Sequence, residues 1–421
     1  MEVTLRCRPD GVGVADPFPA TVVGLEVAAP ARLRVSCADG RGAVDHSEAL
    51  FFADENGTVD PCRDPAVEGS YLGVDPFGLW WSLTGPALFT PSDGFPTTVQ
   101  AIVDGSDAVE VEFERRWLLD GMRRESVSDA GLVGVCYLPS RLPAPGVVVL
   151  GGSDGALETA DPTAAALARC GFVSFALAYF GLPGLPPRLE QIPLEYFGSA
   201  LEWIARRADV AGDRVGVIGR SRGGELALLL GATFPRIGAV VGIAPSGVVW
   251  EAPTYDRQAR AAWIHNGIPV PFAPNAGGPA TAKVLARPPF RFVPLFEEGL
   301  SRRPLVAAAT IPVEQIRGPL LLISGGDDQL WPSQRLTDIA MRRLRDHGRE
   351  GDAQHLSYPQ AGHFVGSPPF LPMGEVMARH PRSLLPAPID YGGTPDANGR
   401  ASSDAWPRIA EFLRTSLTNN S

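Results

Sequence analysis

The chain has 421 residues, of which 45% are hydrophobic and 20% charged, and its formal net charge is −10. This length can bury the cores of two or three domains, and the composition is typical of a folded globular protein rather than a disordered one. The acidic balance argues against a nucleic-acid partner, because binding a polyphosphate backbone requires a concentrated basic surface.

Cysteine usage and hydropathy limit the setting of the protein. The five cysteines are scattered and form no CxxC pair, so the spacing indicates neither a disulfide framework nor a zinc site. We therefore expect no metal and no other cofactor. The first residues lack the apolar core of a secretory signal, and no apolar run reaches the roughly 18 residues of a membrane span. The expectation is a cytoplasmic protein that does not enter a membrane.

Residues 1–120 contain short alternating runs such as TVVGLEVAA and VEVEFERRW, separated by glycine, proline, aspartate and asparagine. A period of two residues is typical of a half-buried strand, because successive side chains point to opposite faces of a sheet. This part of the chain is therefore predicted to be an all-β sandwich or barrel.

The pattern changes after residues 140–146, a stretch with two prolines and a glycine that we interpret as a turn or short connection. Buried strands are then predicted at 146–152, 172–180, 213–219, 237–245, 318–326 and 355–360, and helices at 160–171, 195–210 and 223–234. Strands and helices that alternate at this spacing predict a mostly parallel sheet with helices on both faces.

Residues 246–312 interrupt this alternation and are rich in proline and aromatic residues. We interpret them as an insertion between two strands rather than as part of the sheet. Two roles remain open for the insertion, which could be a structured surface excursion or a lid that shapes an acyl pocket.

One serine stands among glycines directly after a predicted buried strand, in the run VGVIGRSRGGE of residues 215–225. The small neighbours are typical of a nucleophile elbow, a strained strand-to-helix turn that exposes a serine hydroxyl. They also suit an ordinary turn between a strand and a helix. Ser221 is a candidate nucleophile only if a base and an orienting carboxylate accompany it, because an unassisted hydroxyl is a poor nucleophile.

A carboxylate of the required kind follows the predicted strand 318–326. Asp327 and Asp328 are both candidates, since active sites of open parallel sheets lie at the carboxyl ends of strands. We favour Asp328, which fits the frame Gly-x-x-Asp-x-x-x-Pro formed with Gly325 and Pro332. Asp327 would then order the loop by hydrogen bonds to backbone amides.

His363 follows the last predicted strand and is the candidate base. The other five histidines do not lie in a loop at the end of a predicted core strand: His46, His265, His347, His355 and His380. The chain order of serine, acid and histidine is that of α/β-hydrolases. The sequence therefore predicts a catalytic triad of Ser221, Asp328 and His363.

Such a triad requires two backbone N–H groups that stabilise the negative oxygen of the tetrahedral intermediate. We expect one from Arg222, the residue after the serine. The other should come from the glycine-rich loop 151–155, where we favour the amide of Ser153, with Gly152 as the alternative. This loop lacks the GxGxxG pattern of a dinucleotide site. Glu225 is interpreted as a first-turn helix residue favoured by the helix dipole.

Given these residues, the chain resembles the acyl-CoA thioesterase / bile acid-CoA:amino acid N-acyltransferase family over nearly its whole length. Residues 49–83 resemble the most characteristic stretch of that family's N-terminal β-sandwich, and residues 115–139 resemble its connection to the hydrolase domain. The later runs GRSRGGELALLLG, LLLISGGDDQLWPS, LSYPQAGHF and DAWPRIAEFL match in order. The N-terminal domain separates this family from dienelactone hydrolases, which share only the second half.

The resemblance implies an α/β protein with a β-sandwich domain at 1–120 and an α/β-hydrolase domain at 121–421. It also implies an acyl-CoA thioesterase that forms an acyl-serine intermediate, because the family's thioesterases use serine and its acyltransferases often use cysteine. The implied substrate is an acyl-CoA or an acyl thioester of a carrier protein. Where animal members have Ser-Lys-Gly, this chain has Ser-Arg-Gly.

Three other functions remain open at this point. The first is an acyltransferase that moves the acyl group to an amine or another acceptor in a specialised pathway. The second is a carboxylesterase without preference for thioesters. The third is a binding module without catalysis, against which the complete triad counts. The residues indicate no particular acyl chain or oligomeric state.

Overall fold

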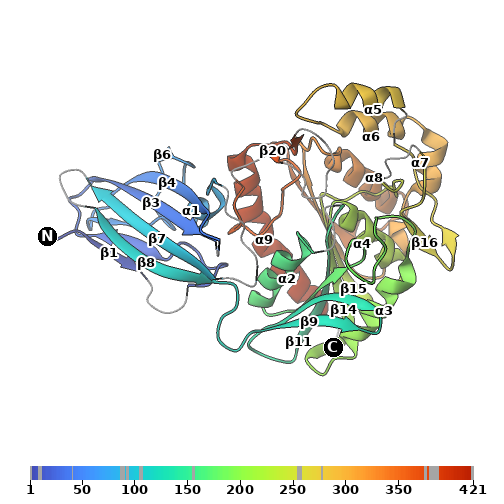
Figure 1. The fold of residues 1–421 in the computed structure, drawn as a ribbon, viewed down its shortest axis with the longest axis horizontal. Coiled ribbons are helices and arrows are strands. Elements are labelled where there is room, and N and C mark those ends of the chain that lie inside the picture. The colour runs from blue at the N-terminus through green and yellow to red at the C-terminus, as the bar shows by residue number, and fades with distance from the viewer. Residues whose placement is uncertain are drawn as a thin grey trace. The chain divides into compact units, whose positions relative to one another are not determined.

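A computed structural model describes residues 2–7, 12–39, 41–85, 91, 94–103, 108–153, 157–253, 258–275, 278–373, 377–378 and 388–418. The chain divides into two compact units, drawn in Figure 1. The first comprises Met1–Asp120, Ser367–Glu375 and Pro395–Trp406, and the second comprises Gly121–Gly366, Val376–Thr394 and Pro407–Ser421. Within the described ranges, none of the helices combines the length and apolar character needed to cross a bilayer.

The first unit contains two antiparallel sheets. The smaller sheet has the order β1-β2-β5 and is formed by β1 (Thr4–Cys7), β2 (Ala20–Val23) and β5 (Thr58–Val59). The larger has the order β6-β4-β3-β7-β8 and is formed by β3 (Pro30–Ala38), β4 (Val44–Phe52), β6 (Glu68–Gly69), β7 (Gly94–Val103) and β8 (Val109–Arg116). Buried residues alternate along β3 and β4, because each strand has one face on the core. The all-β fold expected for this part is confirmed.

Two stretches from late in the chain complete the first unit around its short helix α1 (Gly78–Trp81). The indole N–H of Trp81 donates to the carboxylate of Asp75 at 3.0 Å, and the hydroxyl of Ser403 donates to the same carboxylate at 3.0 Å. The backbone N–H of Met373 donates to the carbonyl of Trp81 at 2.7 Å. These bonds fix segments that lie about three hundred residues apart in the chain.

The second unit is built on an eight-stranded sheet with the order β19-β18-β15-β14-β11-β12-β10-β9. Its strands are β9 (Arg123–Asp129), β10 (Leu132–Leu138), β11 (Ala144–Leu150), β12 (Val173–Ala178), β14 (Val210–Arg220), β15 (Ile237–Ile243), β18 (Leu320–Gly325) and β19 (Ala353–Tyr358). From β12 to β19 all neighbours are parallel, and β10 pairs antiparallel with β9 and β12. Every residue of β15 and β18 is buried, as strands covered on both faces require.

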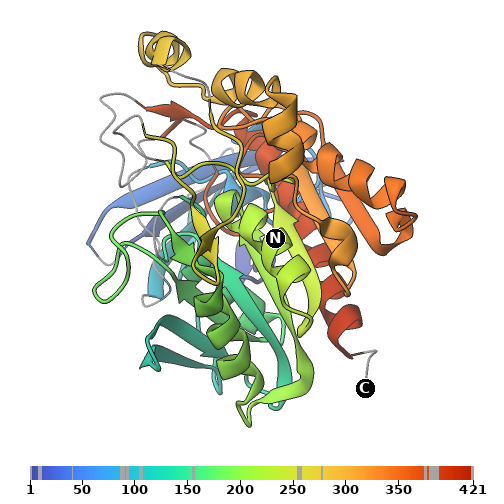
Figure 2. The ribbon, with the colours of Figure 1, turned by 90° about the vertical axis from the view of Figure 1, so that its right-hand side faces the viewer.

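Helices that alternate with the strands pack on this sheet (Figure 2). They are α2 (Ala160–Arg169), α3 (Leu194–Ala205), α4 (Arg222–Thr233) and α8 (Ser333–Asp346). The remaining elements of this part are β13 (Ile192–Pro193), the 3-10 turns Val313–Gln315 and Glu350–Asp352, β20 (Met377–Ala378), β21 (Ile389–Asp390) and the part of the last helix α9 (Pro395–Thr418) from Pro407 onwards. The chain thus has an α/β-hydrolase domain with an all-β region before it, which confirms the expected fold class.

The segment between β15 and β18 contains β16 (Trp263–His265), β17 (Ile268–Pro269), α5 (Gly278–Leu285), α6 (Val293–Leu300) and α7 (Arg303–Ala309). Its strands join β13 in a separate small sheet, and α5, α6 and α7 lie together, as Figure 1 shows. Trp250 and Leu300 of this segment share an apolar core with Trp331, which belongs to the loop after β18. The insertion is therefore packed on a loop at the carboxyl end of a parallel strand.

Candidate active site

Ser221 lies between the end of β14 and the start of α4. Its φ of 56° and ψ of −122° lie outside the regions that residues with side chains ordinarily adopt. The turn is held by hydrogen bonds, because the N–H of Ser221 donates to the carbonyl of Ile243 at 2.8 Å and its carbonyl accepts from the N–H of Gly224 at 2.8 Å. This strained strand-to-helix turn is the geometry of a nucleophile elbow.

The glycine after this turn is required by a close backbone contact. A Cβ atom on Gly223 would lie 2.2 Å from the carbonyl oxygen of Gly151 and 2.6 Å from that of Leu150. Both oxygens belong to rigid backbone, so any side chain at this position would force the elbow away from the end of β11. Glycine therefore allows Ser221 to lie beside the loop that begins at Gly151.

His363 and Asp328 are joined at the carboxyl ends of β19 and β18. Nδ1 of His363 lies 2.8 Å from Oδ2 of Asp328, and both side chains are buried. The other carboxylate oxygen accepts from the backbone N–H groups of Leu330 and Trp331 at 3.0 and 3.2 Å. These bonds fix the orientation of the carboxylate, which in turn fixes the tautomer and plane of the imidazole.

The loop that carries His363 is tied to the serine turn. Nη1 of Arg220, the residue before Ser221, donates to the carbonyl of His363 at 2.9 Å. The backbone N–H of His363 donates to the carbonyl of Tyr391 at 2.8 Å, and the ring of Trp331 lies 6.2 Å from the imidazole. The histidine is therefore held on both its backbone and its ring.

The structure brings two of the three predicted triad residues into direct contact. The hydrogen bonds of the described residues join His363 to Asp328 but include none from the hydroxyl of Ser221. The serine directly follows β14, and the residue is 6% exposed. Hydrogen bonds of this kind are often long without substrate and tighten in the reacting complex.

Asp327, the other candidate acid, has different partners. Its side chain is exposed and accepts from the side-chain amide of Gln329 at 2.7 Å and from the backbone N–H of Gly393 at 3.1 Å. Of the two neighbouring carboxylates, only that of Asp328 is bonded to His363 among the contacts that the structure describes.

The two amides expected to stabilise the oxyanion belong to Arg222, next to Gly223, and to Ser153, in the loop that begins at Gly151. Arg222 is the first residue of α4, so its N–H has no acceptor within the helix. Ser153 is half-buried in the loop after β11, and residues 154–156 of that loop lie outside the described residues. The buried Tyr179 donates its hydroxyl to the carbonyl of Gly151 at 2.6 Å and thereby holds this loop. Sequence reasoning missed Tyr179, whose only signal is its place directly after a buried strand.

The side chains of Arg222 and Glu225 form a buried ion pair in the first turn of α4, directly after Ser221. Nη1 of Arg222 lies 2.7 Å from Oε2 of Glu225, and Nη2 donates to the carbonyl of Trp250 at 2.9 Å. The indole N–H of Trp263 donates to Glu225 at 2.8 Å. Burial raises the pKa of Glu225 to about 7, although Arg222 and Trp263 favour the ionised form. The sequence indicates a role only for the backbone amide of Arg222, whereas its side chain also links α4 to the insertion.

A second serine–histidine contact, between Ser324 and His355, stabilises the sheet and is not a candidate catalytic site. The hydroxyl of Ser324 lies 2.7 Å from Nε2 of His355, and Asp338 lies 3.9 Å from the other ring nitrogen. Ser324 is fully buried inside β18 and cannot meet a substrate, so the contact joins two neighbouring strands. Burial lowers the pKa of His355. His380, also set aside above, lies outside the described residues.

Family models match the chain in two places. The model described as BAAT / Acyl-CoA thioester hydrolase C terminal matches residues 192–419, and that described as Acyl-CoA thioester hydrolase/BAAT N-terminal region matches residues 15–129. Among solved structures, a putative dienelactone hydrolase from Klebsiella pneumoniae is 15% identical, covers 70% of this chain and 99% of its own, and gives a TM-score of 0.44.

Curated relatives match over almost the full length. Acyl-coenzyme A thioesterase 1 of Homo sapiens is 31% identical, and the match covers 99% of this chain and 97% of the relative. Peroxisomal succinyl-coenzyme A thioesterase of Mus musculus is 28% identical, with 98% and 96% covered. The chain therefore belongs to the acyl-CoA thioester hydrolase/BAAT family.

Proposed function

We propose that this protein hydrolyses acyl-CoA thioesters through an acyl-enzyme formed on Ser221. The observation that carries the proposal is the 2.8 Å contact between His363 and Asp328 at the strand ends beside the strained turn at Ser221. The substrate class is supported by the relatives, which are named acyl-coenzyme A thioesterases.

In the first half of the reaction His363 accepts the hydroxyl proton of Ser221 while the serine oxygen attacks the thioester carbonyl. Asp328 orients the imidazole and stabilises the imidazolium that forms. The backbone amides of Arg222 and Ser153 stabilise the oxyanion, because their dipoles are fixed before the reaction begins.

The carbon–sulfur bond then breaks, the His363 imidazolium gives its proton to the sulfur, and coenzyme A leaves as a thiol. A thiol with a pKa of roughly 8.5, like that of free cysteine, leaves readily and needs less help from a general acid than an alkoxide does. In the second half neutral His363 deprotonates a water that attacks the acyl-serine, and the imidazolium then returns this proton to the serine oxygen as the free acid leaves.

Transfer of the acyl group to an amine or another acceptor is the second candidate. It is supported by the burial of the site, since Ser221 and His363 are only 6% and 4% exposed and water has limited access to the acyl-serine. The family description also includes acyltransferases. The two candidates share every step up to the acyl-enzyme.

We propose that residues 246–312 act as the lid of this site. The support is the contact of Trp250 and Trp263, both from the insertion, with the buried pair behind Ser221. We also propose a cytoplasmic location, supported by the five cysteines, none of which forms a disulfide within the described residues.

A panel of acyl-CoA thioesters of increasing chain length, analysed by mass spectrometry, tests the proposal. We expect release of coenzyme A and free acid, and an acyl adduct on the peptide that contains Ser221. The Ser221→Ala variant should lose activity by about 10⁴-fold or more while its circular dichroism spectrum is unchanged. Turnover that survives this substitution would refute the mechanism.

Two controls separate the remaining functions. Adding glycine or taurine to the reaction yields an amide only if the protein is an acyltransferase. Simple oxygen esters turned over as fast as acyl-CoA would indicate a carboxylesterase, and failure of a fluorophosphonate to label Ser221 would indicate a binding module.

A further inference from the structure

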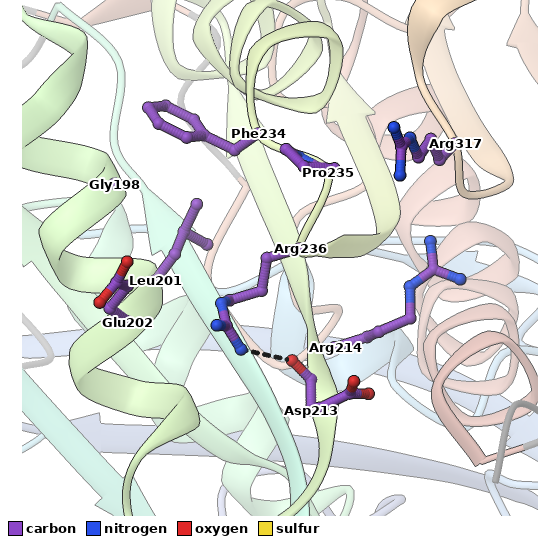
Figure 3. A pocket seen from close by; sticks show the side chains of 9 residues that line it. All are labelled: Gly198, Leu201, Glu202, Asp213, Arg214, Phe234, Pro235, Arg236 and Arg317. Atoms are coloured by element: carbon purple, nitrogen blue, oxygen red, sulfur yellow. Dashed lines mark hydrogen bonds between the residues drawn. The ribbon is translucent and has the colours of Figure 1, made fainter.

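A pocket of about 650 Å³ lies at the amino ends of the parallel strands, away from Ser221 (Figure 3). Three of its residues, Arg214, Arg236 and Arg317, stand at or before the start of the parallel portions of β14, β15 and β18. Since Ser221 directly follows β14, the seven residues from Arg214 to Ser221 span about 23 Å of extended chain. The pocket is therefore distinct from the site of acyl transfer.

The arginines give this pocket an unbalanced positive charge. Within the part of the chain that the structure describes, Arg214, Arg236 and Arg317 form no ion pair, although the protein carries a net charge of −10. The pocket also contains Glu202, which is already paired with Arg206, and Asp213. Three guanidinium groups thus face one uncommitted carboxylate, which leaves an excess of two positive charges.

Two of these guanidinium groups are oriented by the neighbouring strand. Nη2 of Arg214 donates to the carbonyl of Ile237 at 3.2 Å, and Nη1 of Arg236 donates to the carbonyl of Asp213 at 3.0 Å, the bond drawn in Figure 3. Each bond uses one of the five N–H donors of an arginine, so the others remain available for a ligand. The side chains are partly pre-organised, which lowers the entropy lost on binding.

Close backbone packing also fixes the chain next to the third arginine that lines the pocket, Arg317. A Cβ atom on Gly318 would lie 2.2 Å from the carbonyl oxygen of Gly238, so only glycine allows Arg317 to stand this close to β15. Gly238 in turn lies against Arg214, because a Cβ atom there would be 2.9 Å from the Cβ of that arginine. The backbone positions that bring Arg214 and Arg317 to this pocket are thus fixed by the packing of the sheet.

The opposite wall of the pocket is apolar. Phe234, Pro235 and Leu201 line it, and Figure 3 shows the Phe234 ring on the side away from the guanidinium groups of Arg214 and Arg236. We propose that this pocket binds a nucleoside diphosphate. The arginines hold the phosphates by charge-assisted hydrogen bonds, and the base lies against Phe234.

Calorimetric titration of the full-length protein with ADP, pyrophosphate and adenosine tests the proposal. We expect ADP to bind best, pyrophosphate more weakly and adenosine least. The Arg236→Gln and Arg317→Gln variants should each weaken ADP binding about tenfold or more, since each removes a charge-assisted bond. Arg342→Gln, which removes an exposed arginine of α8 outside the pocket, is the matched control and should bind as the unaltered protein does.

ADP affinity that is the same in all three variants, or no binding at all, would overturn the proposal. Equal affinity for ADP and pyrophosphate would overturn the contact between the base and Phe234. Hydrolysis of acyl-CoA by the same preparations reports on the other site separately, so failure here leaves the proposed thioesterase activity standing.

Discussion

Arg222 and Glu225 form an ion pair of 2.7 Å directly after Ser221, and both side chains are buried. The pair connects the residue whose amide would stabilise the oxyanion to Trp250 and Trp263 of the insertion. Breaking a buried pair by removing one partner typically costs about 3–5 kcal/mol, because the other charge remains buried without compensation. The conformation of the serine turn and the conformation of the insertion are therefore coupled.

The pair predicts a pH-dependent stability. Because burial raises the pKa of Glu225 from 4.5 to about 7, the folded protein binds this proton more tightly than the unfolded chain. The resulting contribution is complete below pH 4.5 and is lost as the pH rises through 7. Urea denaturation should show that the free energy of unfolding of the unaltered protein falls by about 3 kcal/mol more over this pH range than that of Glu225→Gln. Parallel pH profiles for the two proteins would contradict the prediction.

The two neighbouring aspartates should differ sharply in kinetics. We expect Asp328→Asn to lower kcat for acyl-CoA hydrolysis by about 10⁴-fold, because the imidazole loses its orienting carboxylate. Asp327→Asn removes only bonds to Gln329 and Gly393 and should change kcat less than about threefold. Steady-state kinetics of both variants decides between them, and the reverse ranking would assign the acid to Asp327.

Tyr179 should act on the reaction through the loop it holds. In Tyr179→Phe the carbonyl of Gly151 loses its 2.6 Å bond, and the loop that carries Ser153 is no longer fixed. We expect kcat to fall about tenfold to a hundredfold with little change in KM. Tyr196→Phe is the matched control, since it removes a 2.6 Å bond to the carbonyl of Ala178, the residue before Tyr179, but leaves the bond from Tyr179 to Gly151 in place. Equal kinetic losses in both variants would mean that the effect comes from stability alone.

A single methyl group should disrupt the serine turn. In Gly223→Ala the added Cβ would lie 2.2 Å from the carbonyl oxygen of Gly151, so the turn or β11 must shift. We expect a loss of stability of about 2 kcal/mol or more, and loss of hydrolysis. Gly351→Ala places its methyl group in open space and should leave both thermal melting and activity unchanged.

Local pattern was sufficient to predict the parallel sheet. The apolar runs that became β15 and β18 are continuous because both faces of these strands are covered, and this signal needs no knowledge of distant residues. The motifs around Ser221, Asp328 and His363 also led to the family that the comparisons confirm. Their catalytic roles remain predictions that the variants above test.

Contacts between distant segments could not be predicted in this way. Nothing in the sequence near Asp75 indicates that Ser403 supplies its hydrogen bond, and so the late segments of the first unit were not expected. The ion pair of Arg222 and Glu225 had a local signal in its spacing of three residues. Its burial depends on two tryptophans of the insertion, which periodicity does not place.

The backbone of Ser221, with its φ of 56°, also has a consequence for thermal stability. A residue with a side chain in such a conformation costs about 1–3 kcal/mol, and glycine would largely relieve this cost. A Ser221→Gly chain should therefore melt at a higher temperature than the natural one while losing its chemistry. The proposed nucleophile would therefore gain its exposed position in the turn at the expense of thermal robustness.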